Sequence, residues 1–310
     1  MKDRLINNPD ASVGVCCSHK VVAVGFNTLH YDASVGGIKP SARINKKYIS
    51  IVILLFLSSL VFSQTINKQG VTILERFSPP NDYVRISYKD GSFQQFIRTF
   101  PLKPFGSPVR LYNGNIKQNN VHVSVFDMEL LNENLIQCAD AIMKLRAEYL
   151  YKTNRYNDIS FTITNGMVVP FLKFSEGYRV IVDGNKSVWK AGYKKGITRD
   201  IFDTYLRFIY MYAGTYSLSM ESKKKNITDI QVGDYFIKGG SPGHVVMVVD
   251  LAKDKTTGKM IMLLGQSYMP SQEFHILNSN TNIAPWYYVS DSELYTPEWS
   301  FGRNSLMSFE

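Results

Sequence analysis

The chain has 310 residues, with 35 Lys and Arg against 26 Asp and Glu, a formal net charge of +9, and 45% hydrophobic residues. The basic residues are spread along the chain rather than gathered into a stripe, which argues against nucleic-acid binding. Three cysteines, two of them adjacent, make no disulfide framework, so an apolar core must hold the folded part together.

Residues 46–63 have the order of features of a secretory signal peptide. Lys46 and Lys47 precede an apolar run over 49–62, and Val61 and Ser63 suit a small-residue cleavage site. The run is shorter than the roughly twenty residues that span a bilayer, although a retained anchor is the alternative. We therefore expect an exported protein, periplasmic or extracellular, with no stable membrane span after cleavage. Residues 1–45 are an upstream extension that we expect to lie outside the fold.

The remaining residues, 64–310, are expected to form a single globular α+β domain, with a central helix packed on a C-terminal antiparallel sheet. The first part is rich in loops, and Ser92 can cap a short helix that runs to Arg98. The clearest helix is expected from Asn132 to about Tyr151, and a second helix begins near Thr198. Alternating or β-branched runs predict strands at 121–125, 159–164, 235–238, 245–250, 260–264 and 274–277.

A Gly-rich turn, Gly239-Gly240-Ser241-Pro242-Gly243, leads to His244 at the start of a strongly β-forming run. Histidine titrates near neutrality, which suits it to work as a general base. A histidine that caps the strand by bonding to backbone is the alternative reading.

Cys138 is the only cysteine after residue 63, and it is either a buried packing residue or a reactive thiol. A reactive thiol needs a helix N-terminus or a nearby cation to lower its pKa. If the helix begins at Asn132, Cys138 lies in the second turn on the apolar face, which favours packing. A start nearer Leu135 favours the nucleophile.

Strand pairing brings a third residue into the argument. If 244–250 and 260–266 form a hairpin with Asp250 opposite Met260, then His244 lies opposite Gln266. A polar side chain beside the histidine is what an orienting group requires, so Gln266 is the first choice and His275 the second. A slip of one residue would move Gln266 to the other face of the sheet.

Two resemblances follow from these segments. The Gly233-Asp234-Tyr235-Phe236 and Gly243-His244-Val245-Val246 segments resemble the histidine half of papain-like NlpC-type and CHAP cell-wall hydrolases. In those enzymes the nucleophilic Cys precedes the His and begins a helix, and Cys138 and His244 have that order. The resemblance implies a papain-like fold and cysteine chemistry.

The second resemblance covers nearly all of the chain after the signal. It rests on Gln137-Cys138-Ala139-Asp140, Tyr212-Ala213-Gly214-Thr215, Gln266-Ser267-Tyr268-Met269-Pro270, His275-Ile276-Leu277 and Thr296-Pro297-Glu298-Trp299. Together these segments resemble an exported bacterial family known as domain of unknown function 4846. That family implies no established activity.

The sequence therefore predicts a cysteine amidase or peptidase that acts on cell-envelope peptide bonds. Cys138 would attack, His244 would take its proton, and Gln266 would orient the imidazole. Asp140, His275 and Ser267 are candidate binding residues. A non-catalytic envelope protein that binds peptide or glycan in the same cleft is the alternative. No cofactor is implied, and no metal site is predicted, because His122, His244 and His275 have no zinc-type spacing with Asp140 or Glu148.

Overall fold

A nine-stranded antiparallel sheet forms the larger part of the structure. The computed structural model describes residues 66–309, and all of them belong to one compact unit. The strand order is β2-β11-β10-β9-β8-β15-β7, with β1 added to β9 and β12 added to β10. The strands of this sheet are β1 (Tyr83–Arg85), β2 (His122–Val125), β7 (Lys223–Lys224), β8 (Tyr235–Lys238), β9 (His244–Asp254), β10 (Met260–Gln266), β11 (His275–Leu277), β12 (Tyr287–Tyr288) and β15 (Leu306–Ser308).

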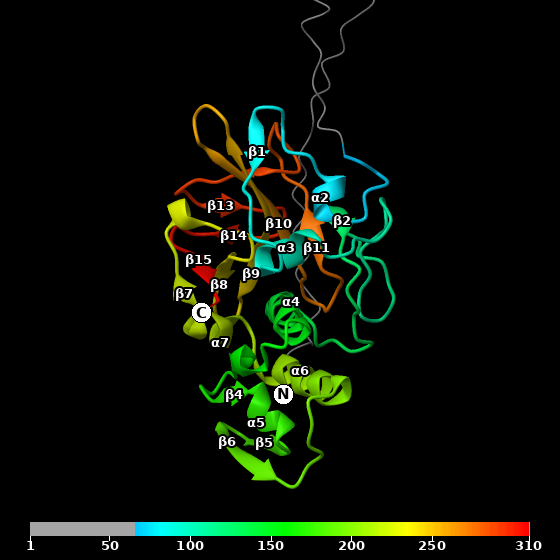
Figure 1. Ribbon diagram of the computed structural model, residues 1–310, viewed down its shortest axis with the longest axis vertical. Coiled ribbons are helices and arrows are strands. Elements are labelled where there is room, and N and C mark those ends of the chain that lie inside the picture. Colours follow the sequence, from blue (N-terminus) through cyan, green and yellow to red (C-terminus); the bar gives the residue numbers. More distant parts are fainter. Residues whose placement is uncertain (1–65, 310) are drawn as a thin grey trace, which may run out of the picture. The chain divides into compact units, whose positions relative to one another are not determined.

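The helices and three small two-stranded ribbons make up the rest. In Figure 1 the large sheet occupies the upper part of the view, α4 lies in the middle, and α5, α6 and the β5–β6 ribbon lie below it. The helices are α2 (Ile73–Arg76), α3 (Phe93–Arg98), α4 (Cys138–Lys152), α5 (Phe171–Ser175), α6 (Arg199–Tyr212) and α7 (Thr215–Glu221). The ribbons pair β3 (Ser160–Thr162) with β4 (Val168–Pro170), β5 (Tyr178–Asp183) with β6 (Lys186–Ala191), and β13 (Leu294–Tyr295) with β14 (Ser300–Phe301).

Strand β9 is the centre of the core. Its residues are buried continuously from His244 to Ala252, so both faces of the strand are covered. Helix α4 packs against β9 and β10, and α3 also packs against β9. An unbroken β-branched run such as Val245-Val246-Met247-Val248-Val249 is typical of a strand covered on both faces. The expected α+β fold, with a central helix on an antiparallel sheet, is confirmed.

A buried ion cluster fastens the N-terminal segment to β9. Asp250, which is fully buried, accepts from Arg85 Nε at 2.7 Å and from Arg98 Nη2 at 2.7 Å. Arg98 also donates to the backbone carbonyls of Ile86, at 2.6 Å, and Leu251, at 3.0 Å. Burying a carboxylate is costly unless it is paired and hydrogen-bonded, and this one has both kinds of partner. The early segment thus belongs to the core through β1 and α3.

Several local expectations are confirmed. Ser92 caps α3, and Thr198 caps α6 by accepting from the backbone N–H of Ile201. The strand expected at 235–238 coincides with β8. The strand expected at 159–164 is shorter, because only Ser160–Thr162 pairs with β4. The helix expected from Asn132 is wrong at its start, as described below.

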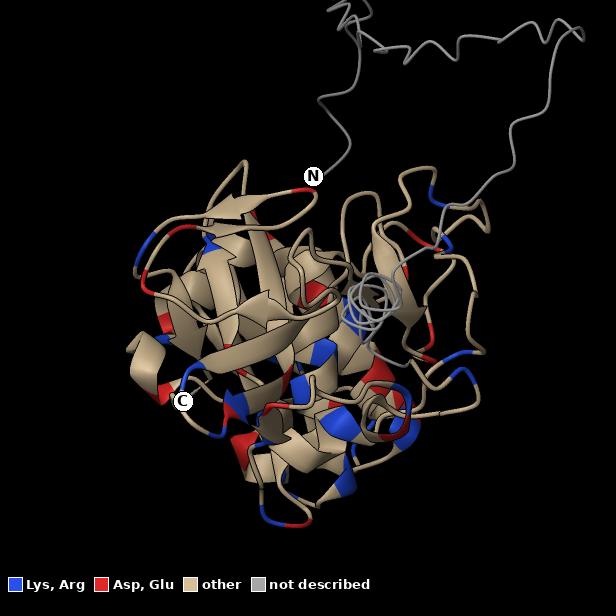
Figure 2. Ribbon diagram, turned by 90° about the horizontal axis from the view of Figure 1, so that it is seen from above, with Lys and Arg blue, Asp and Glu red and all other residues tan. Residues whose placement is uncertain are grey.

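Charged residues of both signs are interspersed over the described elements (Figure 2). Between residues 66 and 309, no helix is both long enough and apolar enough to cross a bilayer. The predicted signal peptide and the upstream extension lie outside the described residues.

Candidate functional site

Cys138 is the first residue of α4, six residues later in the sequence than the expected start at Asn132. It is partly exposed, and the backbone N–H groups of Ala139, Val245 and Cys138 act to lower the pKa of its thiol. Val245 directly follows His244, so the thiol lies at the start of β9. The first N–H groups of a helix have no partner inside the helix, which leaves them free for a negative charge.

The segment before α4 is not helical because Ser271 holds it in another conformation. Ser271 Oγ donates to the carbonyl oxygen of Ile136 at 2.7 Å, and the backbone N–H of Ser271 donates to Asn134 Oδ1, also at 2.7 Å. The carbonyl of Ile136 is therefore engaged by the loop after β10. Asp140 then accepts from the backbone N–H of Gln137 at 3.0 Å, which fixes the first turn of α4.

His244 begins β9 and is buried. Its Nε2 lies 2.8 Å from Gln266 Oε1, at the end of the neighbouring strand β10. The rings of Tyr268 and Trp299 lie over the imidazole, with centroid distances of 4.7 and 5.4 Å. His244 and Gln266 are both buried, and shielding a hydrogen bond from water strengthens it.

The orientation of the Gln266 amide fixes the tautomer of His244. Gln266 Nε2 donates to Glu298 Oε2 at 2.7 Å and lies 3.5 Å from His275 Nε2. His275 in turn uses Nδ1 to donate to the backbone carbonyl of Glu273 at 2.8 Å, so its Nε2 is an acceptor. The amide nitrogen therefore faces Glu298 and His275, and the amide oxygen faces His244. It follows that His244 carries its proton on Nε2 and keeps the lone pair on Nδ1.

Gln266 comes beside His244 by a register other than the expected one. Asp250 was predicted to pair with Met260, but it pairs with Leu263, and Met260 pairs with Lys253. The observed register therefore differs from the predicted one by three residues. A bulge between Leu263 and Leu264 then reduces this difference to two residues, so that Gly265 pairs with Met247. Because side chains alternate with a period of two, Gln266 stays on the same face as His244. The predicted register is wrong, but the predicted neighbour is present.

Burial favours the neutral forms of both groups. Burial, with a smaller contribution from the charge of Asp140, raises the pKa of the Cys138 thiol to about 12. Burial lowers the pKa of His244 to about 4, although the hydrogen bond to Gln266 and the charge of Glu298 oppose this. At rest Cys138 is therefore a neutral thiol and His244 a neutral imidazole, rather than a thiolate and an imidazolium.

The three candidate binding residues are all buried. Asp140 caps α4, as described above. Ser267 donates to the backbone carbonyl of Gln272 at 2.6 Å, which shapes the loop that holds the segment before Cys138. His275 supports Gln266 from β11, where the two residues are paired. All three lie next to the candidate catalytic residues, and a direct contact with a ligand stays a prediction for each.

Glu298 and Lys117 complete the array and were given no role from the sequence. Lys117 Nζ donates to Glu298 Oε1 at 2.6 Å and lies 5.4 Å from the centroid of the Tyr268 ring. Glu298 belongs to the Thr296-Pro297-Glu298-Trp299 segment, which contributes to the family resemblance. The sequence did not indicate that Glu298 bonds to Gln266. The sequence pattern around Tyr268, in the segment after Gln266, likewise predicts no role for its ring.

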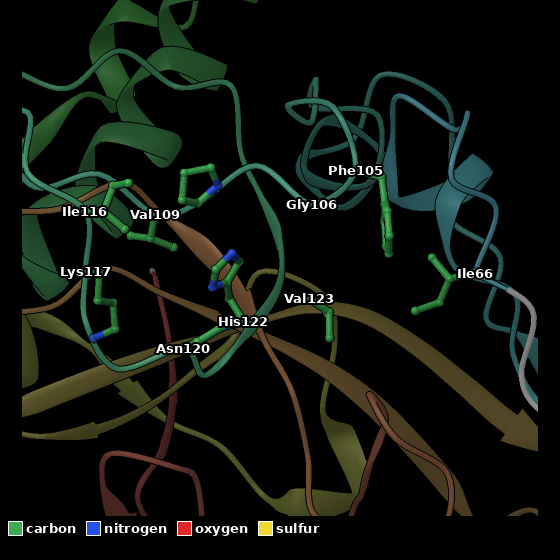
Figure 3. Close-up of a pocket in the computed structure, with 10 residues that line it drawn as sticks. Ile66, Phe105, Gly106, Val109, Ile116, Lys117, Asn120, His122 and Val123 are labelled. Atoms are coloured by element: carbon green, nitrogen blue, oxygen red, sulfur yellow. The ribbon is translucent and has the colours of Figure 1, made fainter.

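Lys117 also lines a pocket of about 340 Å³ beside this array. In Figure 3 the ring of His122, from β2, stands among the lining side chains, with Lys117 to one side and Phe105 facing it from another loop. His122 Nε2 donates to the backbone carbonyl of Ser107 at 3.0 Å. The His122 and His275 rings are 5.9 Å apart, and in the described part of the chain no three His, Cys, Asp or Glu residues are gathered in a way that could hold a metal ion.

The fold and the site define an α+β protein in which a buried histidine at the start of β9 bonds to a glutamine of β10, and a cysteine begins the helix that packs against β9. The chain matches the model of the family named domain of unknown function 4846 over residues 73–308, and it belongs to that family. No curated protein and no solved structure matches the chain significantly.

Proposed function

We propose that this protein is a cysteine hydrolase that cleaves amide bonds in peptides of the cell envelope, with Cys138 as nucleophile, His244 as general base and Gln266 as the residue that orients the imidazole. The observation that carries this proposal is the placement of Cys138 at the first position of α4, the helix that packs against β9, which His244 begins. A nucleophile, a base and an orienting group are then gathered from α4, β9 and β10.

The chemistry follows from the neutral resting pair. The Cys138 sulfur attacks the amide carbon while its proton passes to Nδ1 of His244, and the imidazolium then gives that proton to the departing amine. Water, deprotonated by His244, attacks the resulting thioester and releases the acid and the free thiol. The backbone N–H groups in the first turn of α4 would stabilise the oxyanion.

The pocket beside Lys117 suits an apolar part of such a substrate. Phe105, Val109, Ile116 and Val123 contribute to its lining. Its wall includes Lys117, which bonds to Glu298 and so adjoins the residues that hold Gln266. A peptide side chain bound there would lie near the reacting pair.

A second candidate function is non-catalytic binding of peptide or glycan in the same cleft. The burial that raises the pKa of Cys138 and lowers that of His244 favours this alternative, because each shift opposes formation of the thiolate. In that case Cys138 packs the start of the helix, and His244 only bridges β9 and β10.

The pH dependence of Cys138 alkylation by iodoacetamide separates the two functions. In the hydrolase, His244 takes the proton of the thiol during the attack, so the rate should be independent of pH from above the His244 pKa of about 4 up to the pH at which free thiolate carries the reaction. His244→Ala removes that acceptor, and the rate should then rise about tenfold per pH unit. His122→Ala is the matched control and should keep the plateau. A wild-type rate that rises with pH as in the His244→Ala variant would overturn the hydrolase and favour the binding protein.

Substrate and location are tested separately. Release of new amino groups from peptidoglycan fragments by the wild-type protein, but not by Cys138→Ala, would identify the envelope peptide as substrate. Export is proposed from the signal-like segment alone, and mass spectrometry of the N-terminus of the protein recovered from the periplasm or the medium checks it. A chain that retains residues 46–63 in the cytosol would refute export.

A further inference from the structure

A second pocket, of about 290 Å³, lies on the far part of α4 and is independent of the catalytic proposal. Its walls come from Phe93 in α3, Arg146 in α4, Arg155 after α4, Lys225 after β7 and Phe309 near the C-terminus. Arg146 is eight residues beyond Cys138 in α4, which is about 12 Å along the helix axis. The pocket also contains the Val232-Gly233-Asp234 segment, which the candidate catalytic array does not use.

Arg146 has an environment that is unusual for a cation. Its guanidinium lies over the rings of Phe93, Tyr149 and Phe309, at 5.2, 5.9 and 5.6 Å from their centroids. Between residues 66 and 309, no carboxylate lies within ion-pair distance of it. Burial lowers the pKa of Arg146, and the nearby charge of Arg155 lowers it further. The aromatic rings offset only part of that cost, and an anion would offset more of it.

Among the described residues, the charges around the pocket leave one positive charge without an ion-pair partner. Arg155 pairs with Asp158 at 2.6 Å, and Lys225 pairs with Asp234 at 2.7 Å. Asp234 also accepts from the backbone N–H of Gln231 at 2.6 Å, so it is held toward the turn that carries it. Arg146 therefore contributes the unmatched charge. One unmatched charge suits a monoanion such as a carboxylate better than a dianion such as phosphate.

The shape of the pocket depends on Gly233. This residue has φ +91°, which favours glycine, and a Cβ there would come within 2.9 Å of the Phe93 ring. The close approach holds Phe93 over Arg146 and gives the pocket an apolar wall beside its cation. A planar carboxylate can accept two parallel hydrogen bonds from a guanidinium, while an apolar group attached to it contacts the rings.

From these observations we propose that the pocket around Arg146 binds a ligand with one carboxylate attached to an apolar or aromatic body. The carboxylate accepts hydrogen bonds from the Arg146 guanidinium, Arg155 adds attraction from the rim, and the rings of Phe93 and Phe309 contact the ligand's apolar part. Such a site would serve a ligand other than the scissile bond, because it lies away from Cys138.

The test is calorimetric titration of the purified full chain with 3-phenylpropionate, and with 3-phenylpropionamide as the uncharged control of the same shape. We expect the acid to bind at least about tenfold more tightly than the amide, because only the acid makes charge-assisted hydrogen bonds. Arg146→Gln should remove that preference. Arg199→Gln, which changes an arginine paired with Glu148 outside the pocket, should leave it unchanged.

Equal binding of acid and amide, no binding of the acid, or an unchanged preference in Arg146→Gln would each overturn the proposal. Circular dichroism checks that the variants fold. If Arg146→Gln does not fold, Arg155→Gln replaces it, because Arg155 is half exposed and its loss leaves the core intact. An Arg155→Gln variant that binds the acid as tightly as the wild type would then count against the site, and one that binds it about threefold less tightly would support it.

Discussion

The two buried histidines make the fold sensitive to acid well above the range in which ordinary carboxylates titrate. Burial lowers the pKa of His244 from 6.5 to about 4, and that of His275 from 6.5 to about 3. In the unfolded chain both histidines take up a proton as the pH falls through 6.5, whereas in the folded chain they stay neutral. The unfolded state then binds more protons, so stability is complete above about pH 6.5 and is lost as the pH falls toward the folded pKa values.

The size of the effect follows from the two pKa values. Each proton bound only by the unfolded state costs about 1.4 kcal/mol per pH unit, so two histidines together give a slope of about 2.7 kcal/mol per pH unit below pH 6. At pH 5 the loss is about 4 kcal/mol, which is a large part of the 5–15 kcal/mol of a typical domain. Most of the remaining loss occurs between pH 5 and pH 4.

The assay is urea unfolding of the purified protein at several pH values from 8 to 5, followed by tyrosine and tryptophan fluorescence. We expect the free energy of unfolding to be constant from pH 8 to 7 and then to fall along the slope given above. His275→Gln removes one of the two titrating groups and should halve the slope, whatever it does to the absolute stability. A free energy of unfolding that is the same at pH 7 and pH 5 would refute the reasoning about buried neutral histidines.

Two further predictions concern single side chains. Asp250→Asn leaves Arg98 charged and buried without its carboxylate, so unfolding should cost about 3–5 kcal/mol less. The urea midpoint should fall at unchanged slope, whereas the exposed control Asp203→Asn should change stability by less than about 0.5 kcal/mol. A loss below about 1 kcal/mol for Asp250→Asn would contradict this. Glu298→Gln removes the carboxylate that fixes the amide of Gln266, so the plateau rate of Cys138 alkylation should fall about tenfold; an unchanged plateau would show that Glu298 does not position the amide.

Sequence patterns were sufficient where local interactions decide the structure. Ser92 and Thr198 cap their helices because their hydroxyls reach backbone N–H groups three residues ahead, which depends only on neighbouring residues. The strands β8 and β9 follow from runs of β-forming residues that are long enough to cross a sheet. The order of a cysteine before a histidine also identified the two elements that meet at the site.

Patterns were insufficient where a distant residue decides. Asn132 is a good cap, but the hydroxyl of Ser271 takes the carbonyl of Ile136 and delays α4 until Cys138. The helical spacing of apolar residues does not reveal the hydrogen bond between Ser271 and Ile136. In the same way, Glu298 reaches Gln266 from 32 residues away in the chain, beyond three further strands.

The bulge between Leu263 and Leu264 has a consequence for how related chains should be compared. Without that bulge, the register in which Leu263 pairs with Asp250 would continue to the end of β10. Gln266 would then lie on the opposite face of the sheet from His244. The number of residues between the histidine and the glutamine therefore does not by itself show whether they are in contact. One must also know whether a bulge has shifted the strand pairing by one residue, because such a shift moves a side chain to the other face of the sheet. A relative in which one residue of β10 is deleted could keep both residue types and lose their contact. Conversely, a relative whose spacing differs by one residue would keep the contact by gaining or losing a bulge.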